Sequence, residues 1–464
     1  MTGFAVRGVI EGFYGRPWSP GQRLEMVDFI AARGMTTFVY GPKDDPALRR
    51  DWKVPFGETD RTRLTQLRRH CEAAGVELLV CVSPGLTIRY SDADDVRALA
   101  DKLASTLDLG AAGVGLLLDD IPDRLQHPAD QAAFGSLAEA HALLALAVAE
   151  RVRSRYPGAS LFVCPTIYWG YGDEPYLVDL ASRLPEDIDL CWTGRAICSA
   201  SLDLHDAERF TAATGRPPLY WDNYPVNDVA MTFEAHLGPY QGRDPRLATA
   251  SRGIVANPME HFESSKIPLA TVADFLADPD EYDPEESWHR AIADVVGGSR
   301  RDAEAGADVE AFATYATNVR LSCLEPSDSP EIVRLIEDFT FASTVGSAEE
   351  RIEAAVAVAR AGQRLRDAVV RIGGPGFANP ALATEQAPWL RVAGLGADAL
   401  VALGSVFAGA RAPSEAAVAA ALRPHLAVLR EQRFRVFGDV LEMTLTDLVD
   451  PPAAHPRTDH GATP

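Results

Sequence analysis

The chain has 464 residues, of which 47% are hydrophobic and 24% are charged. These proportions are ordinary for a globular protein, and they exclude a mostly disordered or collagen-like chain. The formal net charge is −22, and a surface of that charge repels nucleic acid and anionic membranes. We therefore expect neither nucleic acid nor a membrane as a partner.

The cellular compartment is predicted from what the sequence lacks. No apolar run reaches the roughly 18 residues that a membrane span needs, and the first residues do not have the pattern of a signal peptide. The six cysteines are scattered, without CxxC pairs or the Cys/His spacing of a zinc site. These features predict a cytoplasmic protein with reduced thiols.

Short apolar runs alternate with helix-patterned stretches over residues 4–280. Eight runs are predicted as strands: Phe4–Glu11, Thr36–Tyr40, Glu77–Ser83, Gly113–Asp119, Leu161–Pro165, Ile188–Trp192, Pro218–Trp221 and Gly253–Ala256. Several are apolar without interruption, which is typical of parallel strands buried on both faces. Eight such β-then-α units favour an α/β fold, a closed (β/α)8 TIM barrel over residues 1–282.

The helices between these strands include residues 19–33 and 130–156. Ser19 is placed to cap the first of them, and Gly34 suits the left-handed turn that follows a helix. An open doubly wound sheet is the alternative architecture. It would need a Gly-rich phosphate turn after an early strand, and the nearest candidate, Gly12–Gly15, has the wrong spacing.

The strand pattern stops after the predicted barrel. Residues 285–320, 330–372 and 380–448 have helical patterns, and the run Gly373–Gly376 separates two of them. They predict an all-α helical domain over residues 283–450. Residues 451–464 show no apolar periodicity, which predicts a disordered tail.

Polar and aromatic side chains follow all eight predicted strands, whereas the opposite strand ends show no such concentration. In barrels of this kind the chemistry lies where strands run into the following loops. Aromatic rings there suit the apolar faces of sugars. The aromatic residues near this rim are Tyr14, Tyr168, Trp169, Trp192, Trp221 and Tyr224. The pattern predicts a pocket at this rim.

Asp119 and Asp120 are the most informative residues of the rim, because they directly follow the apolar run Leu116–Leu118. Of two neighbouring carboxylates in a half-dry pocket, one is expected to stay ionised and the other to hold a proton. One chemistry that suits them is a metal-dependent hydrolase or lyase, in which Glu11 or Asp222 adds a further carboxylate.

The other chemistry is glycoside hydrolysis. Two acids normally flank the sugar from opposite faces, which adjacent residues on one strand cannot easily do. A 2-acetamido sugar removes this difficulty, because its own carbonyl oxygen can attack the anomeric carbon. One Asp then steers the acetamido N–H and the other protonates the leaving oxygen. A third hypothesis, a sugar- or glycopeptide-binding protein without catalysis, is disfavoured by the two intact aspartates.

Six runs resemble a known enzyme family, the O-GlcNAcase or hyaluronidase-like β-N-acetylglucosaminidases of glycoside hydrolase family 84. They are GVIEGFYGRPWS from Gly8, YGPKDDP from Tyr40, LLLDDI from Leu116, YWDNYPVND from Tyr220, GPYQGR from Gly238 and ANPMEHFE from Ala256. The resemblance implies a retaining hydrolase that removes terminal N-acetylglucosamine through an oxazoline intermediate, with no metal or other cofactor. It also allows a homodimer.

The resemblance assigns roles by motif. Asp119 would orient and polarise the acetamido N–H, and Asp120 would act as general acid and then as general base. Seven residues fall on substrate-binding positions: Gly12, Lys43, Tyr168, Trp221, Asn223, Asp228 and Asn257. Of these, Tyr168 would assist at the intermediate and Trp221 would line the acetamido pocket. The others would hold sugar hydroxyls or the acetamido group, Gly12 through its backbone.

The charge and one departure from the family pattern bear on the substrate. A net charge of −22 disfavours polyanionic hyaluronan and favours neutral terminal N-acetylglucosamine on a peptide or small glycoside. The family often has a polar residue where this chain has Ile167, next to Tyr168, and the run at 169–172 is unlike the family's. This departure bears on the role of Tyr168 and on the aglycone contacts.

Overall fold

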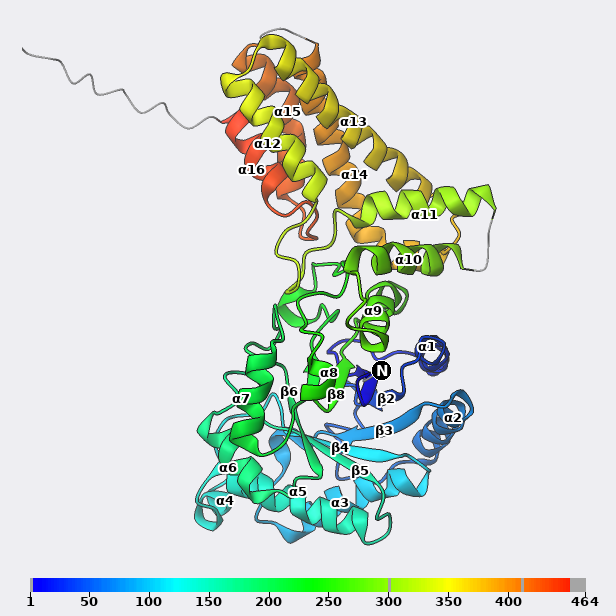
Figure 1. Ribbon diagram of the computed structural model, residues 1–464, viewed down its shortest axis with the longest axis vertical. Coiled ribbons are helices and arrows are strands. Elements are labelled where there is room, and N and C mark those ends of the chain that lie inside the picture. The colour runs from blue at the N-terminus through cyan, green and yellow to red at the C-terminus, as the bar shows by residue number, and fades with distance from the viewer. Residues whose placement is uncertain (1–2, 299–301, 410–412, 451–464) are drawn as a thin grey trace, which may run out of the picture. The chain divides into compact units, whose positions relative to one another are not determined.

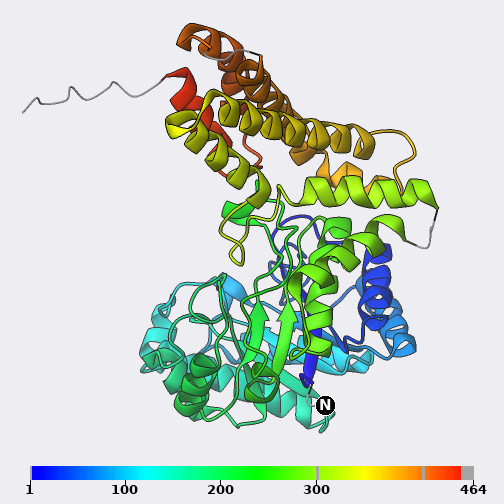
Figure 2. The same ribbon diagram turned by 45° about the horizontal axis from the view of Figure 1, so that its top comes forward.

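The computed structural model describes residues 3–298, 302–409 and 413–450. The chain divides into two compact units (Figures 1 and 2). The barrel unit comprises Met1–Thr232, His236–Val295 and Leu321–Pro326, and the helical unit comprises Phe233–Ala235, Val296–Arg320 and Ser327–Pro464. Residues 451–464, for which the sequence predicts a disordered tail, lie outside the described residues.

Eight parallel strands close into a barrel in chain order, with β8 paired to β1. The strands are β1 (Val6–Glu11), β2 (Thr37–Tyr40), β3 (Glu77–Val82), β4 (Gly113–Leu117), β5 (Ser160–Cys164), β6 (Ile188–Trp192), β7 (Leu219–Asp222) and β8 (Gly253–Ala256). The predicted TIM barrel and each of its eight strands are thereby confirmed.

Helices lie around the outside of the barrel (Figure 1). They are α1 (Pro20–Ala31), α2 (Glu58–Ala74), α3 (Ala93–Asp108), α4 (Pro128–Ala133), α5 (Leu137–Arg153), α6 (Pro175–Arg183), α7 (Leu204–Thr214), α8 (Leu247–Ala250) and α9 (Phe262–Ala277). The next helix, α10 (Pro284–Gly297), begins in the barrel unit.

Helix caps explain where the helices begin. Ser19 forms a capping box with Gln22 at the start of α1, and Gly34 adopts the expected left-handed conformation with φ of 75°. The single helix predicted over 130–156 is wrong, because the chain forms α4 and α5 there. Ser136 ends the run by capping a new helix: its hydroxyl accepts the backbone N–H of Glu139 at 3.0 Å.

The strands are buried on both faces, as their apolar sequences predict. One cluster fills the inside of the barrel and includes Ile10, Leu117, Phe162 and Trp221. A larger cluster packs the outer strand faces against the helices. The inside is tight at Gly115, where a Cβ atom would lie 2.4 Å from the Phe162 ring, so only glycine fits there.

The helical unit confirms the predicted α-helical C-terminal region. Its helices are α11 (Ala303–Ala316), α12 (Pro330–Val345), α13 (Ala348–Ile372), α14 (Pro380–Ala408), α15 (Glu415–Arg430) and α16 (Val440–Val449). The glycine run at 373–376 separates α13 from α14, as expected. These two helices approach closely at Gly362 and Gly404, where a Cβ atom would meet the backbone of the other helix.

One helix tests the expectation that no segment could span a membrane. By length and composition α14 is long and apolar enough to do so, although no uninterrupted apolar run was found in the sequence. However, 56% of its most apolar stretch is buried inside the structure, mainly by packing on α13. Burial of this kind is what the central helix of a bundle shows, so the composition alone is weak support for a membrane span.

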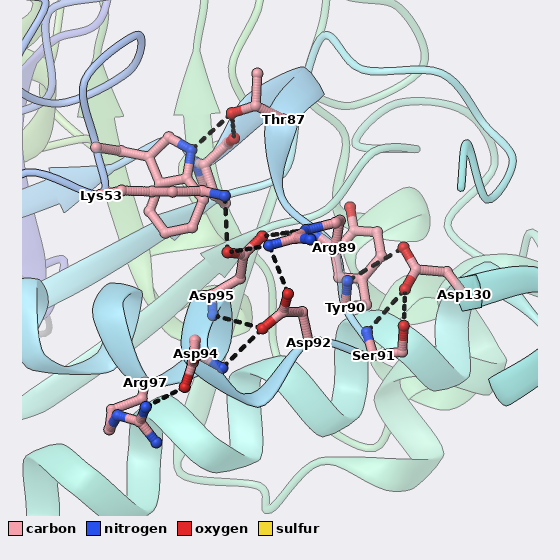
Figure 3. A network of polar contacts seen from close by, with 12 residues as sticks. Lys53, Thr87, Arg89, Tyr90, Ser91, Asp92, Asp94, Asp95, Arg97 and Asp130 are labelled. Carbon is pink, nitrogen blue, oxygen red and sulfur yellow. Dashed lines mark hydrogen bonds and ion pairs between the residues drawn. The ribbon is translucent and has the colours of Figure 1, made fainter. Parts of the chain in front are cut away.

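Two buried carboxylates fix the loop between β3 and α3 (Figure 3). Asp95 accepts hydrogen bonds from the backbone and guanidinium of Arg89 at 3.0–3.2 Å and from Lys53 at 2.7 Å. Burial acts to raise the pKa of Asp95, but these bonds lower it to about 2. Asp130 accepts the backbone N–H groups of Tyr90 and Ser91 at 3.1 and 2.8 Å. The loop is therefore held by charge-assisted bonds.

A buried histidine connects this loop to the one after β5. The two ring nitrogens of His141 hydrogen-bond the hydroxyls of Tyr90 and Tyr176, each at 2.8 Å. The Tyr176 hydroxyl also accepts the backbone N–H of Thr166 at 3.2 Å. Burial lowers the pKa of His141 from 6.5 to about 3. A neutral ring, which donates from one nitrogen and accepts at the other, completes this chain of bonds at neutral pH.

This low pKa makes the stability of the barrel unit depend on pH. The unfolded chain protonates His141 below about pH 6.5, whereas the folded protein does so only near 3, so stability falls as the pH falls through this window. Between pH 7 and pH 5 this one group costs about 2 kcal/mol. We expect His141→Gln to reduce the pH dependence of urea unfolding over that interval by this amount. The exposed His205→Gln should keep the wild-type dependence, and an unchanged dependence in His141→Gln would contradict the assignment.

Candidate active site

A cavity of about 500 Å³ lies at the carboxyl ends of the barrel strands. Its lining residues are Gly12, Tyr14, Lys43, Asp119, Asp120, Cys164, Tyr168, Thr193, Ile197, Cys198, Trp221, Asn223, Val226, Asp228, Val229, Ala230, Met231 and Asn257. All nine site residues expected from the sequence are among them, and they come from the ends of six different strands. The structure therefore brings the nine predicted residues together in one cavity.

Asp119 lies at the bottom of the cavity and is only 5% exposed. Its Oδ2 forms an ion pair with the buried ammonium group of Lys43. Burial acts to lower the pKa of Lys43, but the Asp119 carboxylate outweighs this effect and keeps that pKa above its usual value. The second oxygen, Oδ1, is buried and has no hydrogen-bond partner among the described residues. A buried acceptor without a partner is costly, which indicates a place for a ligand donor.

Asp120 has a different environment, although it is the next residue. Its backbone is left-handed, with φ of 51°, and its side chain is exposed at the cavity mouth. Its two carboxylate oxygens accept the hydroxyls of Tyr14 at 2.7 Å and Tyr168 at 3.0 Å. Burial and the bond to Asp120 raise the pKa of Tyr14 to about 12, and burial raises the pKa of Tyr168 further. Both phenols therefore stay protonated and donate to Asp120.

A chain of amide hydrogen bonds forms the opposite wall. Asn257 accepts the backbone N–H of Gly12 at 3.2 Å and donates to Asn223 at 3.0 Å. The Trp221 indole donates to the same Asn223 oxygen at 2.9 Å. At Gly12 a Cβ atom would lie 2.4 Å from the Trp221 ring. Glycine is thus required for this close approach, and the wall is fixed before any ligand binds.

Asp228 completes this wall. Its Oδ2 accepts the backbone N–H of Tyr14 at 2.7 Å, which ties the loop after β7 to the loop after β1. Burial raises the pKa of Asp228 above its usual value, although the bond from Tyr14 opposes the shift. Asp228 lines the cavity, so its carboxylate adds an acceptor to this side of the site.

The two other carboxylates considered as metal ligands are already paired. Glu11 is fully buried and accepts two hydrogen bonds from Arg23 at 2.7 and 2.9 Å. Asp222 accepts two from Arg243 at 2.7 and 2.9 Å. Over the described ranges, no group of three or more His, Cys, Asp or Glu side chains could hold a metal ion. A metal site built on Asp119, Asp120 and Glu11 lacks its third ligand, so the geometry does not support that alternative.

Some aromatic residues expected at the rim lie elsewhere, and one arginine next to the cavity was not predicted from the sequence. Tyr14 and Tyr168 line the cavity with Trp221. Trp192 and Tyr224 do not, because their side chains are buried in the larger core cluster outside the barrel. The arginine is Arg49, whose guanidinium donates to the Tyr14 hydroxyl at 2.9 Å. Tyr14 was expected at this rim and lines the cavity. No signal in the sequence connects it to Arg49.

Comparison with known proteins agrees with this geometry. The family model described as beta-N-acetylglucosaminidase matches residues 7–314. The chain belongs to this family. It is similar to Protein O-GlcNAcase of Rattus norvegicus and of Mus musculus, each 32% identical over 272 residues, which are 57% of this chain and 29% of the relative. The match thus spans less than a third of the length of these two relatives.

Two solved structures extend the comparison beyond the barrel. An O-GlcNAc hydrolase mutant of Thermobaculum terrenum superimposes with a TM-score of 0.88 at 30% identity, covering 96% of this chain and 94% of that one. The structure of CpGH84B superimposes with a TM-score of 0.83 at 24% identity, covering 96% and 77%. The second likeness concerns the fold alone. The first covers nearly the whole of both chains.

Arg49 is expected to position the general-acid candidate through Tyr14. In Arg49→Met the Tyr14 hydroxyl loses its donor while Tyr168 still holds Asp120. We expect kcat/KM for an aryl N-acetylglucosaminide to fall about tenfold, the equivalent of one hydrogen bond to a charged group. The matched control is Arg50→Met, because Arg50 is exposed and pairs with Asp51. Equal activity of the two variants would show that Tyr14 does not depend on Arg49.

Proposed function

We propose that this protein is a retaining β-N-acetylglucosaminidase of the O-GlcNAcase type. It cleaves terminal β-linked N-acetylglucosamine by substrate-assisted catalysis through an oxazoline intermediate. One observation carries the proposal. Asp119 keeps one oxygen on Lys43 and presents the other, buried and without a partner among the described residues, beside an Asp120 held at the mouth by two phenols.

The first step uses both aspartates. The acetamido N–H of the bound sugar donates to Asp119 Oδ1, which makes the acetamido oxygen a better nucleophile. That oxygen attacks the anomeric carbon while Asp120 gives its proton to the leaving glycosidic oxygen. The aglycone departs as an alcohol, and the sugar is left as an oxazolinium ion whose N–H faces the Asp119 carboxylate. The Lys43 ammonium balances the negative charge of the Asp119 carboxylate during this step.

The second step returns the proton. Asp120, now a carboxylate, takes a proton from a water molecule that attacks the anomeric carbon from the face the aglycone left. The bond from this carbon to the acetamido oxygen breaks, and the acetamido group is restored. Two inversions give net retention. The Tyr14 and Tyr168 hydroxyls stabilise Asp120 whenever it is ionised, because both are donors.

The remaining lining residues recognise the sugar. The N–H of Gly12 is already bonded to Asn257, so the group that Gly12 offers to a sugar hydroxyl is its carbonyl. Asp228, Asn223 and Asn257 supply acceptors and donors in a fixed wall. Trp221 presents an apolar face to the acetamido methyl group. A sugar-binding protein without catalysis would not need a proton donor and a buried, lysine-paired carboxylate in the same cavity.

The proposal also covers the substrate class, the cellular compartment and the oligomeric state of the enzyme. The net charge of −22 supports a neutral N-acetylglucosamine-bearing glycoside or glycopeptide as substrate, with neither nucleic acid nor a membrane as partner. We place the enzyme in the cytoplasm, where the six cysteines stay reduced. The helical unit is the proposed site of homodimerisation, which light scattering would test.

The two aspartates should respond differently to the leaving group. We expect Asp120→Ala to lower kcat/KM roughly a thousandfold for aryl glycosides with poor leaving groups and far less for good ones, because only the former need a proton. Asp119→Ala should lose a similar factor on all of them. Asp123→Ala, an exposed acid on the same loop, is the control. Equal and mild losses in both variants would refute the assignment.

The acetamido group itself should be the nucleophile. Replacing the N-acetyl group by N-trifluoroacetyl weakens the carbonyl oxygen, so we expect kcat/KM to fall at least about a hundredfold. The measurement is a rate series over mono-, di- and trifluoroacetyl substrates, with added chelator as the control that should leave every rate unchanged. A flat series would mean that a protein side chain attacks instead. A rate abolished by chelator would revive the metal-dependent alternative.

A further inference from the structure

Two cysteines lie beside the cavity and take no part in the proposed mechanism. Cys198, in the loop after β6, lines the cavity itself. Cys323 lies in the segment 321–326 of the barrel unit, and its thiol approaches the backbone oxygen of Asn223 at 4.0 Å. Neither is in a disulfide, and both are partly exposed. The two thiols lie close enough for each to shift the pKa of the other.

This pair flanks Asn223 on two sides. The Asn223 side chain donates to the backbone oxygen of Ile197, the residue before Cys198, at 2.8 Å. Its backbone oxygen is the one that the Cys323 thiol approaches. Asn223 in turn carries the hydrogen bonds from Trp221 and Asn257 that form the wall of the cavity. A change in the distance between the two sulfurs is therefore transmitted to this wall.

The two thiols differ in reactivity. The neighbouring Cys198 thiol and the charge of Arg243 lower the pKa of Cys323, whereas the Cys323 thiol and burial raise the pKa of Cys198. The positive charge of Arg243 favours the thiolate of Cys323, and Cys198 is the neighbouring thiol. Burial raises the pKa of Cys71 to about 12 and places those of Cys81 and Cys164 well above the usual value. These three thiols are poor nucleophiles.

We propose that Cys198 and Cys323 are an oxidisable dithiol site, which hydrogen peroxide converts into a disulfide that impairs sugar binding at Asn223. The Cys323 thiolate attacks one peroxide oxygen, the O–O bond breaks, and the other oxygen leaves as hydroxide and becomes water on taking a proton. The sulfur of Cys198 then attacks the Cys323 sulfenic acid, so that the S–S bond forms and the S–O bond breaks. The hydroxyl leaves as water with the Cys198 proton.

Two electrons pass from the two thiols to the peroxide, and a reducing dithiol reverses the change.

The disulfide alters the cavity because it brings the two sulfur atoms closer together. An S–S bond is about 2.05 Å long, much shorter than a contact between two thiols. Closing that gap draws the Ile197–Cys198 segment and Cys323 together and disturbs both contacts of Asn223. The effect on activity rests on the proposed function, whereas formation of the disulfide does not.

The test uses the full chain. The reduced protein is exposed to hydrogen peroxide, quenched with catalase and alkylated, then mapped by mass spectrometry without reduction and assayed on an aryl N-acetylglucosaminide. We expect a cross-linked Cys198–Cys323 peptide that is two hydrogens lighter than the two free peptides. We also expect a rise in KM of about tenfold, the equivalent of one lost hydrogen bond to the sugar, with a smaller change in kcat. Dithiothreitol should reverse both.

Variants separate this site from the other thiols. Cys323→Ser and Cys198→Ser, each compared with its own reduced form, should lose the cross-link and the peroxide-dependent rise in KM. Cys71→Ser, in α2 and away from the cavity, should keep both. The proposal is overturned if the wild type forms no such peptide, if KM does not change when it forms, or if the loss persists in Cys323→Ser. A Cys164–Cys191 cross-link formed in place of the Cys198–Cys323 one would overturn it too, because Cys164 also lines the cavity and its oxidation would then explain the change in KM.

The design also distinguishes two kinds of failure. A cross-linked Cys198–Cys323 peptide in a protein whose reduced form hydrolyses no N-acetylglucosaminide would refute the proposed function and leave the dithiol site standing. An active reduced enzyme that forms no such peptide would refute the dithiol site alone. Peptide mapping of the wild type needs no variant, so the result holds even where a serine substitution prevents folding.

Discussion

The ion pair between Lys43 and Asp119 is the interaction on which the rest of the site depends. Both groups are buried, and taking two charges out of water is expensive unless each is held by further bonds. The barrel provides this by placing the two residues at the ends of different strands and packing the space below them with apolar side chains. Removing either partner would leave an uncompensated charge inside the barrel. The pair thereby fixes an ionised carboxylate at the bottom of a half-dry cavity.

The backbone turn at Asp120 separates two acids that the sequence places side by side. In an extended strand, successive side chains would point to opposite faces, one to the barrel interior and one to the outer layer of helices. Strand β4 ends at Leu117, and the left-handed conformation at Asp120 directs its carboxylate to the cavity mouth, where it accepts hydrogen bonds from two phenol hydroxyls. Asp119 stays inside with Lys43. Two adjacent carboxylates thus have different environments, one in the interior and the other at the solvent boundary, which suits the two roles proposed for them.

Residue types and strand positions can be predicted from the sequence, but the partners of buried charges cannot. Apolar runs determined all eight strands, and their ends converged on one cavity because parallel strands present the same end to the same rim. The sequence does not say that Glu11 pairs with Arg23, so Glu11 was considered as a metal ligand. Nor does it say that Trp192 faces outward onto Phe210, with ring centroids 5.1 Å apart, while Trp221 faces into the barrel. These contacts depend on which face of the strand each side chain points to. A shift of the strand register by one residue would move every side chain to the opposite face.

The number of hydrogen bonds that each buried carboxylate accepts distinguishes scaffold from site. Glu11 accepts three, two from Arg23 and one from the backbone of Trp18, and Asp222 accepts three, two from Arg243 and one from Tyr240. Both lie at strand ends, as Asp119 does, yet both of their oxygens are occupied. Asp119 is equally buried and keeps one oxygen without a partner among the described residues. Folding alone would favour a second donor there, because an unmet acceptor in a low dielectric costs about 1–3 kcal/mol. In the proposed mechanism the acetamido N–H of the sugar is the donor to this oxygen, and a protein donor there would compete with the substrate.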